Sequence, residues 1–179
     1  MNQSFQAALK RLVTTVGSAR DPLHYAVADL SARAVQGTFV ACAVLAALWL
    51  AWRFRRHPRD WADPRVAAEL AILLAAMVVA DPLAWKAHYV ALIVPYTFVW
   101  WALGRRPPDA PGRGWRWAMW WGSFACITLS APAIWGNSVR DVLESLNVIL
   151  LGALLLLILA VSLVESTTAS RLLTDRDAR

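Results

Sequence analysis

The 179-residue chain is 59% hydrophobic and only 17% charged. This balance excludes an ordinary soluble domain, which would struggle to stay in solution with so much apolar surface. The formal net charge of +6 does not by itself indicate nucleic acid, because in an apolar chain the placement of basic residues among the loops reports membrane topology.

The first 33 residues carry charges throughout and lack the apolar stretch of a signal peptide. Apolar residues repeat at helical spacing from Phe5 to Val16, with polar and basic residues elsewhere on the helical wheel. We therefore expect an amphipathic helix on the outer membrane surface that ends at Gly17. A second helix, capped by Asp21 and Pro22, is expected to lead into the first membrane span.

Five apolar windows follow, and a helical crossing of a bilayer needs roughly 20 mostly apolar residues. The windows lie at about 34–53, 66–80, 88–104, 117–138 and 146–164. The second carries Glu69 near one end and the third contains Pro95, so we expect these two to be tilted, broken or continued into their flanks. The predicted fold class is all-α: a polytopic membrane helix bundle of about five transmembrane helices over residues 34–164, with a cytoplasmic tail at 165–179.

Basic residues are concentrated in alternate links between these windows. Arginines bracket the first and third links, namely Arg53, Arg55, Arg56, Arg59 and Arg65, and Arg105, Arg106, Arg113 and Arg116. The other links carry one basic residue each, Lys86 and Arg140. Loops rich in Lys and Arg remain in the cytoplasm, so we expect residues 1–33 to be extracytoplasmic and the C-terminus to be cytoplasmic. The protein is expected to be a multi-pass protein of the cell (inner or plasma) membrane, with the lipid bilayer and not nucleic acid as its partner. Tryptophans at the window edges are typical of a membrane interface: Trp49, Trp52, Trp61, Trp100, Trp101, Trp115, Trp117 and Trp135.

Polar residues cluster at the start of the third window, in the stretch ADPLAWKAHYVALIVPY. Asp81 can cap a helix whose first residue is Pro82, so that Lys86 and His88 stand near the outer mouth of the bundle beside a positive helix N-terminus. Such a place suits a phosphate. The simpler alternative is a capped helix start with an interfacial His and a Lys whose amine reaches the surface.

One face of this helix is expected to carry Trp85, His88 or Tyr89, Leu92 and Pro95. A single His there cannot hold a metal ion. Cys42 and Cys126 both lie in predicted spans, with too few partners for a metal site or a disulfide framework. We predict neither a metal nor a cofactor.

The stretch ADPLAWKAHYVALIVP resembles a motif of glycosyltransferase family 87, the polyprenol-phosphate-mannose-dependent mannosyltransferases, that reads approximately S-P-x-S-W-x-H-H-Y-V-x-L-x-x-P. The opening MNQSFQAALKRLV is similar to a second stretch of that family, N-Q-S-L followed by a helix ending in R-L-L, which lies upstream of the first. The matching positions are Asn2, Gln3, Ser4, Leu9, Arg11, Leu12, Pro82, Trp85, His88, Tyr89, Val90, Leu92 and Pro95. Together with the five windows, the resemblance covers nearly the whole chain.

This resemblance implies the C-terminal part of a C-type membrane glycosyltransferase, which moves mannose or a similar hexose from a polyprenyl-phosphate carrier to an extracytoplasmic lipid or glycan acceptor. The residues expected to contact the donor are Asn2, Gln3, Arg11, Asp81, Trp85, Lys86, His88 and Tyr89. In related enzymes the general base is a carboxylate of an earlier outer loop, so the resemblance also implies a missing N-terminal membrane half as partner. The chain departs from the motif at Ala84, which replaces Ser, at Ala87, which replaces the first His of the pair, and at Asp81, which stands for Ser or Asn.

Two other functions remain open from the residues. A noncatalytic membrane scaffold or degenerate subunit is favoured by Ala87 and by the absence of the family's base region. A transporter has less support, because apart from Glu69 no charged residue lies well within a span and no ion path is visible.

Overall fold

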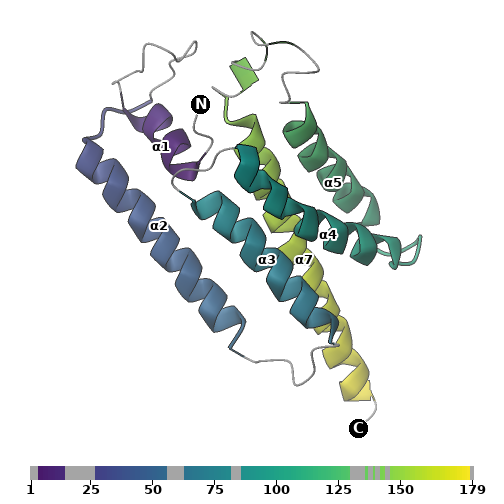
Figure 1. Cartoon of the computed structure of the whole chain (residues 1–179). Helices are drawn as coiled ribbons and strands as arrows, with labels where there is room; N and C mark the ends of the chain where they lie inside the picture. The colour runs from purple at the N-terminus through teal and green to yellow at the C-terminus, as the bar shows by residue number, and fades with distance from the viewer. Residues whose placement is uncertain are drawn as a thin grey trace.

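The computed structural model describes residues 4–14, 27–55, 63–81, 86–129 and 146–177, together with positions 136, 139, 142 and 143. Within these ranges side chains are described except at residues 64, 86–88 and 165–177. The described chain contains helices and no strand, which confirms the all-α fold class (Figure 1). Its elements are α1 (Phe5–Val13), α2 (Ala32–Arg53), α3 (Pro64–Ala80), the 3-10 helix η1 (Lys86–Leu92), α4 (Ile93–Gly104), α5 (Arg113–Thr128) and α7 (Val148–Asp177).

α7 is the central helix of the bundle and packs against α3, α4 and α5. Most of its buried side chains lie three or four positions apart and so form one continuous face: Ile149, Ala153, Leu156, Leu159, Ala160 and Leu163. Opposite this face, α3 buries Ala71, Ile72 and Ala75 completely or almost so. Because several of these residues are alanines, the helix axes can approach closely, as at helix interfaces inside membranes.

A buried polar chain joins α4, α5 and α7. The Tyr96 hydroxyl lies 2.5 Å from Ser123 Oγ, which in turn donates to the Gly152 carbonyl at 2.7 Å. A Cβ atom at Gly152 would lie 2.9 Å from the Ser123 carbonyl oxygen and 2.9 Å from Ile127 Cγ1. The absence of a side chain at Gly152 therefore allows α5 and α7 to pack against each other.

The third predicted window is divided between two kinds of helix. It begins as the 3-10 helix η1 and continues as α4, with Pro95 in the first turn of the α-helix. Proline lacks the N–H that a continuous α-helix would direct at Ala91, and its ring crowds the preceding turn. The change of helix type at Ile93 avoids both costs, since a 3-10 turn makes different hydrogen bonds.

Two other helix ends differ from the sequence prediction. α5 ends at Thr128 with Leu129 as its C-cap, well before the predicted end near residue 138. The sequence has Pro132 three residues beyond this cap, and a proline disfavours helix in the residue before it. α7 instead extends beyond the predicted end at Val164 to Asp177, over a stretch without glycine or proline that could stop it.

α2 stands at one side of the bundle next to α1 (Figure 1). Val35 and Phe39 near its start are buried, whereas most of its other side chains are exposed. By length and composition, α2 is the one helix among the described residues able to cross a membrane. Tyr89–Gly104 and Val148–Val164 form shorter apolar helices. The predicted set of about five crossings therefore stays a prediction.

Arginine and tryptophan side chains pair at three helix ends. The guanidinium carbon of Arg105 lies 4.3 Å from the Trp101 ring centroid, after α4. Equivalent pairs join Arg55 to Trp52 after α2, at 5.4 Å, and Arg116 to Trp115 at the start of α5, at 5.2 Å. All three arginines belong to the two links predicted to be cytoplasmic.

Candidate functional site

The two stretches that carry the family resemblance lie at the same end of the bundle (Figure 1). We call this the motif end and define it as α1, Asp81, η1 and Asn147. α1 contacts both α2 and α3, and η1 contacts α3 and α4. Figure 1 shows α1 beside the last turn of α3 and the first turn of α7. The fold thus brings together residues about eighty positions apart in the sequence.

α1 is closed at both ends by hydroxyl side chains. The Ser4 side chain is fully buried and its Oγ accepts a hydrogen bond from the Ala7 N–H at 3.1 Å, which makes Ser4 the N-cap. At the other end, the Thr14 N–H and hydroxyl both donate to the Lys10 carbonyl, at 3.1 and 2.8 Å. The helix therefore ends at Val13 and not at Gly17 as predicted, because Thr14 is extended and satisfies the Lys10 carbonyl, one of the last four of the helix. The predicted cap at residues 21–22 lies outside the described residues.

α1 is held against the chain that follows it. The Phe5 and Phe39 rings lie 6.3 Å apart between centroids, a typical aromatic contact. The segment before α2 returns along α1: Val27 N–H donates to the Leu12 carbonyl and Leu30 N–H to the Val13 carbonyl, each at 2.8 Å. α1 is therefore a docked part of the fold, in addition to having the amphipathic pattern predicted for it.

Arg11 is the described site residue with the most specific partner. Its guanidinium Nη2 donates a hydrogen bond to the side-chain carbonyl of Asn147, across 136 residues of sequence. Asn147 is 8% exposed and has a φ of 55°, a left-handed conformation in which Asn is among the commonest residues other than Gly. The backbone carbonyl of Asn147 accepts a hydrogen bond from the Leu151 N–H at 3.0 Å, which is the first hydrogen bond of α7. This contact fixes α1 to the start of the central helix.

Asp81 ends a helix in the structure. It is the C-cap of α3, with an extended backbone, and its N–H donates to the Met77 carbonyl at 2.9 Å. The extended conformation follows from the next residue, because Pro82 disfavours α geometry in the residue before it. The predicted helix start at Pro82 lies outside the described residues, and the following helix is described from Lys86. α3 packs against η1, the helix that contains Tyr89.

The predicted face of the following helix is largely a packing face. Tyr89 is 7% exposed and Leu92 1%, and Pro95 is also buried, all within the main core. Lys86 and His88 lie in η1, where the structure describes their backbone. Trp85 lies outside the described residues, as do Asn2 and Gln3. Of the eight predicted donor-binding residues, the structure therefore describes the side chains of Arg11, Asp81 and Tyr89.

Asn147 was not predicted as a member of this group. The sequence SLNVILL contains a signal, since an Asn directly before an apolar helical run is typical of a helix start. Its pairing with Arg11 could not be read from the sequence, because it depends on how α1 docks. No group of three or more His, Cys, Asp or Glu side chains suited to a metal ion occurs in the part of the chain that is described.

Comparison with known proteins identifies no relative. No family model matches the chain, and neither does any curated protein or any solved structure. The resemblance to glycosyltransferase family 87 therefore rests on the two motif stretches of the sequence.

Proposed function

We propose that this chain is the C-terminal membrane part of a family 87 glycosyltransferase. It supplies one wall of the site at which a mannosyl or similar hexosyl residue leaves a polyprenyl phosphate for an extracytoplasmic lipid or glycan acceptor. His88, Trp85, Lys86 and Arg11 contact the donor, assisted by Asn2, Gln3, Asp81 and Tyr89. The enzyme is a multi-pass protein of the cell membrane with a cytoplasmic C-terminus.

The observation that carries this proposal is that the two motif stretches lie at the same end of the bundle, where both contact α3. α1 contacts the end of α3, and the Arg11 guanidinium bonds to the residue that begins α7. A sugar phosphate needs cationic donors gathered from several elements, since phosphate is bound best by converging charged hydrogen bonds. The fold brings the stretch containing Arg11 to the same end as the turn containing Lys86 and His88 (Figure 1).

The membrane part of the proposal is supported by the surface of the molecule. Apolar side chains such as Leu45, Leu48 and Trp52 of α2 are 58–66% exposed, which costs little in lipid and much in water. The three arginine–tryptophan pairs follow the pattern of interface anchors, in which the indole lies at headgroup level and the cation reaches the aqueous side. In the topology predicted from the arginine-rich links, the two links that carry these pairs lie on the opposite side of the membrane from the motif end.

A binding experiment with the full chain tests the proposal. The purified chain in mild detergent is titrated with a radiolabelled polyprenyl-phosphate mannose, and bound lipid is measured after gel filtration. His88→Ala is expected to weaken binding about tenfold or more, as for loss of a charged or charge-assisted contact to phosphate. Arg55→Ala, at an exposed position beyond the other end of α2, is the matched control and should leave binding unchanged. Equal binding by all three proteins contradicts the donor site.

A noncatalytic scaffold is the second candidate, and one observation favours it. Each described site residue has a structural role: Arg11 fixes α1 to α7, Asp81 ends α3 and Tyr89 packs in the core. In this case the wild-type chain inserts into membranes and folds but retains no polyprenyl-phosphate sugar in the same titration. That result distinguishes the two functions.

A further inference from the structure

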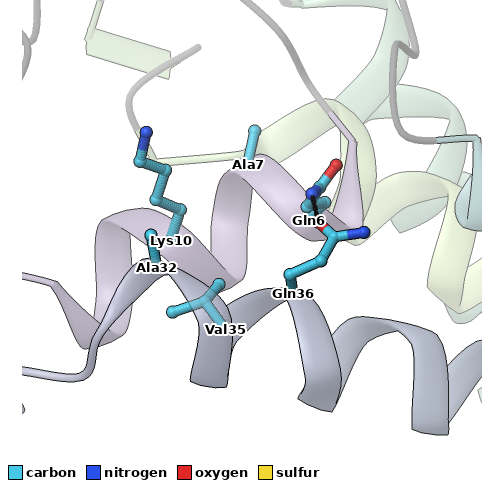
Figure 2. Close-up of a pocket in the computed structure, with 6 residues that line it drawn as sticks. All are labelled: Gln6, Ala7, Lys10, Ala32, Val35 and Gln36. Carbon is cyan, nitrogen blue, oxygen red and sulfur yellow. Dashed lines mark hydrogen bonds between the residues drawn. The ribbon is translucent and has the colours of Figure 1, made fainter.

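α1 and α2 enclose a groove of about 430 Å³ at the motif end. The described residues that line it come from these two helices: Gln6, Ala7 and Lys10 of α1, and Ala32, Val35 and Gln36 of α2. Figure 2 shows the Gln6 and Gln36 side chains meeting at one end of the opening, with Lys10 at the other end. Gln6 Nε2 donates to Gln36 Oε1. The groove thus has a small apolar floor between a pair of amides and a cation.

An apolar stripe runs down α2 from this groove. Gln36 is followed at intervals of four residues by Val40, Val44 and Leu48, which are 47%, 50% and 61% exposed. Residues four apart lie on one face of a helix. The stripe from Gln36 to Leu48 is about 18 Å long at 1.5 Å per residue, close to the roughly 15 Å of one leaflet's hydrocarbon.

We propose that this groove binds the headgroup of an anionic glycerophospholipid of the membrane. The phosphate pairs with the Lys10 ammonium, the polar headgroup lies on the Gln6–Gln36 amides, and one acyl chain follows Val40, Val44 and Leu48 down α2. The bound lipid covers the exposed side of α2, which makes few contacts with the rest of the bundle beyond α1. The inference rests on the membrane insertion of α2 within the proposed function and not on sugar transfer.

The lining favours a membrane phospholipid over the sugar donor. The described lining residues all belong to α1 and α2, whereas Asp81 lies at the end of α3 and Lys86 and His88 lie in η1. Lys10 and the amides line the groove at the start of the lipid-length stripe of Val40, Val44 and Leu48, whose side chains are exposed and lie outside the main core. A cation above an apolar surface complements a lipid whose charge and chains are similarly arranged.

The test uses the purified full chain in mild detergent, titrated with short-chain phosphatidylglycerol and followed by native mass spectrometry. Lys10→Gln is expected to weaken phosphatidylglycerol binding about fivefold, the equivalent of one basic residue against an anionic lipid. Lys10→Arg keeps the charge and should bind within about twofold of wild type. Arg33→Gln removes the same charge from an exposed position next to the groove that does not line it, and should also stay near wild type.

Three results overturn the inference. Equal weakening by Lys10→Gln and Arg33→Gln indicates general electrostatic attraction, without a site. Dependence on Lys10 for polyprenyl phosphate but not for phosphatidylglycerol assigns the groove to the carrier lipid. Phosphatidylcholine binding as tight as that of phosphatidylglycerol removes the charge argument. Alkaline carbonate extraction separates this inference from the proposed function: a chain released from membranes contradicts both, whereas an inserted chain with Lys10-independent binding contradicts the groove alone.

Discussion

Gly152 allows a quantitative test of how α5 and α7 pack. A Cβ atom at this position would meet the Ser123 carbonyl oxygen and Ile127 Cγ1 at 2.9 Å and Cys126 Cβ at 3.0 Å. A backbone oxygen on the facing helix cannot rotate away, so the helices must separate, at a cost of about 1–3 kcal/mol for overpacking. Alanine also gains roughly 1 kcal/mol over glycine in a helix interior. Gly152→Ala is therefore expected to destabilise the fold by about 0–2 kcal/mol.

Gly122 of α5 provides the matched control, because a Cβ atom there meets nothing within 4 Å. Gly122→Ala has the propensity gain without the clash and should stabilise the fold by about 1 kcal/mol. The two variants are compared by denaturant unfolding in mild detergent, followed by tryptophan fluorescence and far-UV circular dichroism. The expected difference in free energy of unfolding is about 1–3 kcal/mol, with Gly152→Ala the less stable. Equal shifts for the two variants would refute close packing at Gly152.

Three further predictions concern the motif end and the topology. Arg11→Ala and Asn147→Ala should each destabilise the fold, and a double-mutant cycle should give a coupling of about 1 kcal/mol or more for this charged hydrogen bond; additive effects contradict the contact. Ser4→Ala removes the N-cap and should cost about 1 kcal/mol locally, seen as faster hydrogen exchange in α1 and unchanged exchange in α7. In intact cells, with the native cysteines replaced, a membrane-impermeant maleimide should label Val27→Cys, while Arg55→Cys should react after lysis; the reverse pattern contradicts the predicted orientation.

Helix positions were predictable from the sequence because they depend on local pattern. The apolar windows and the periodicity after Phe5 identify the helices α1 to α5 and α7, since a buried or lipid-facing helix needs a continuous apolar surface. The ends were less predictable. Thr14, Leu129 and the stretch after Val164 show that caps, a nearby proline or the lack of a stop signal shift a boundary by several residues.

The partners of the site residues were less predictable than the helices. The sequence identifies Arg11 as a candidate phosphate ligand, but the bond to Asn147 depends on the docking of α1 over the start of α7. Likewise, Tyr89 belongs to the motif by its position, yet its burial depends on the packing of η1 against α3 within the main core. Contacts between segments far apart in the sequence follow from the whole packing arrangement, which no local pattern encodes.

The contact between Arg11 and Asn147 also fixes an order of events during synthesis. Its two residues are 136 positions apart, and at bacterial or eukaryotic elongation rates the later one emerges on the order of ten seconds after the first. α1 and α2 leave the ribosome long before the residue that anchors α1 is made. For that interval α1 can pack against α2, and later against α3, but not against Asn147. The bond between Arg11 and Asn147 therefore belongs to the last stage of assembly, when the start of α7 arrives.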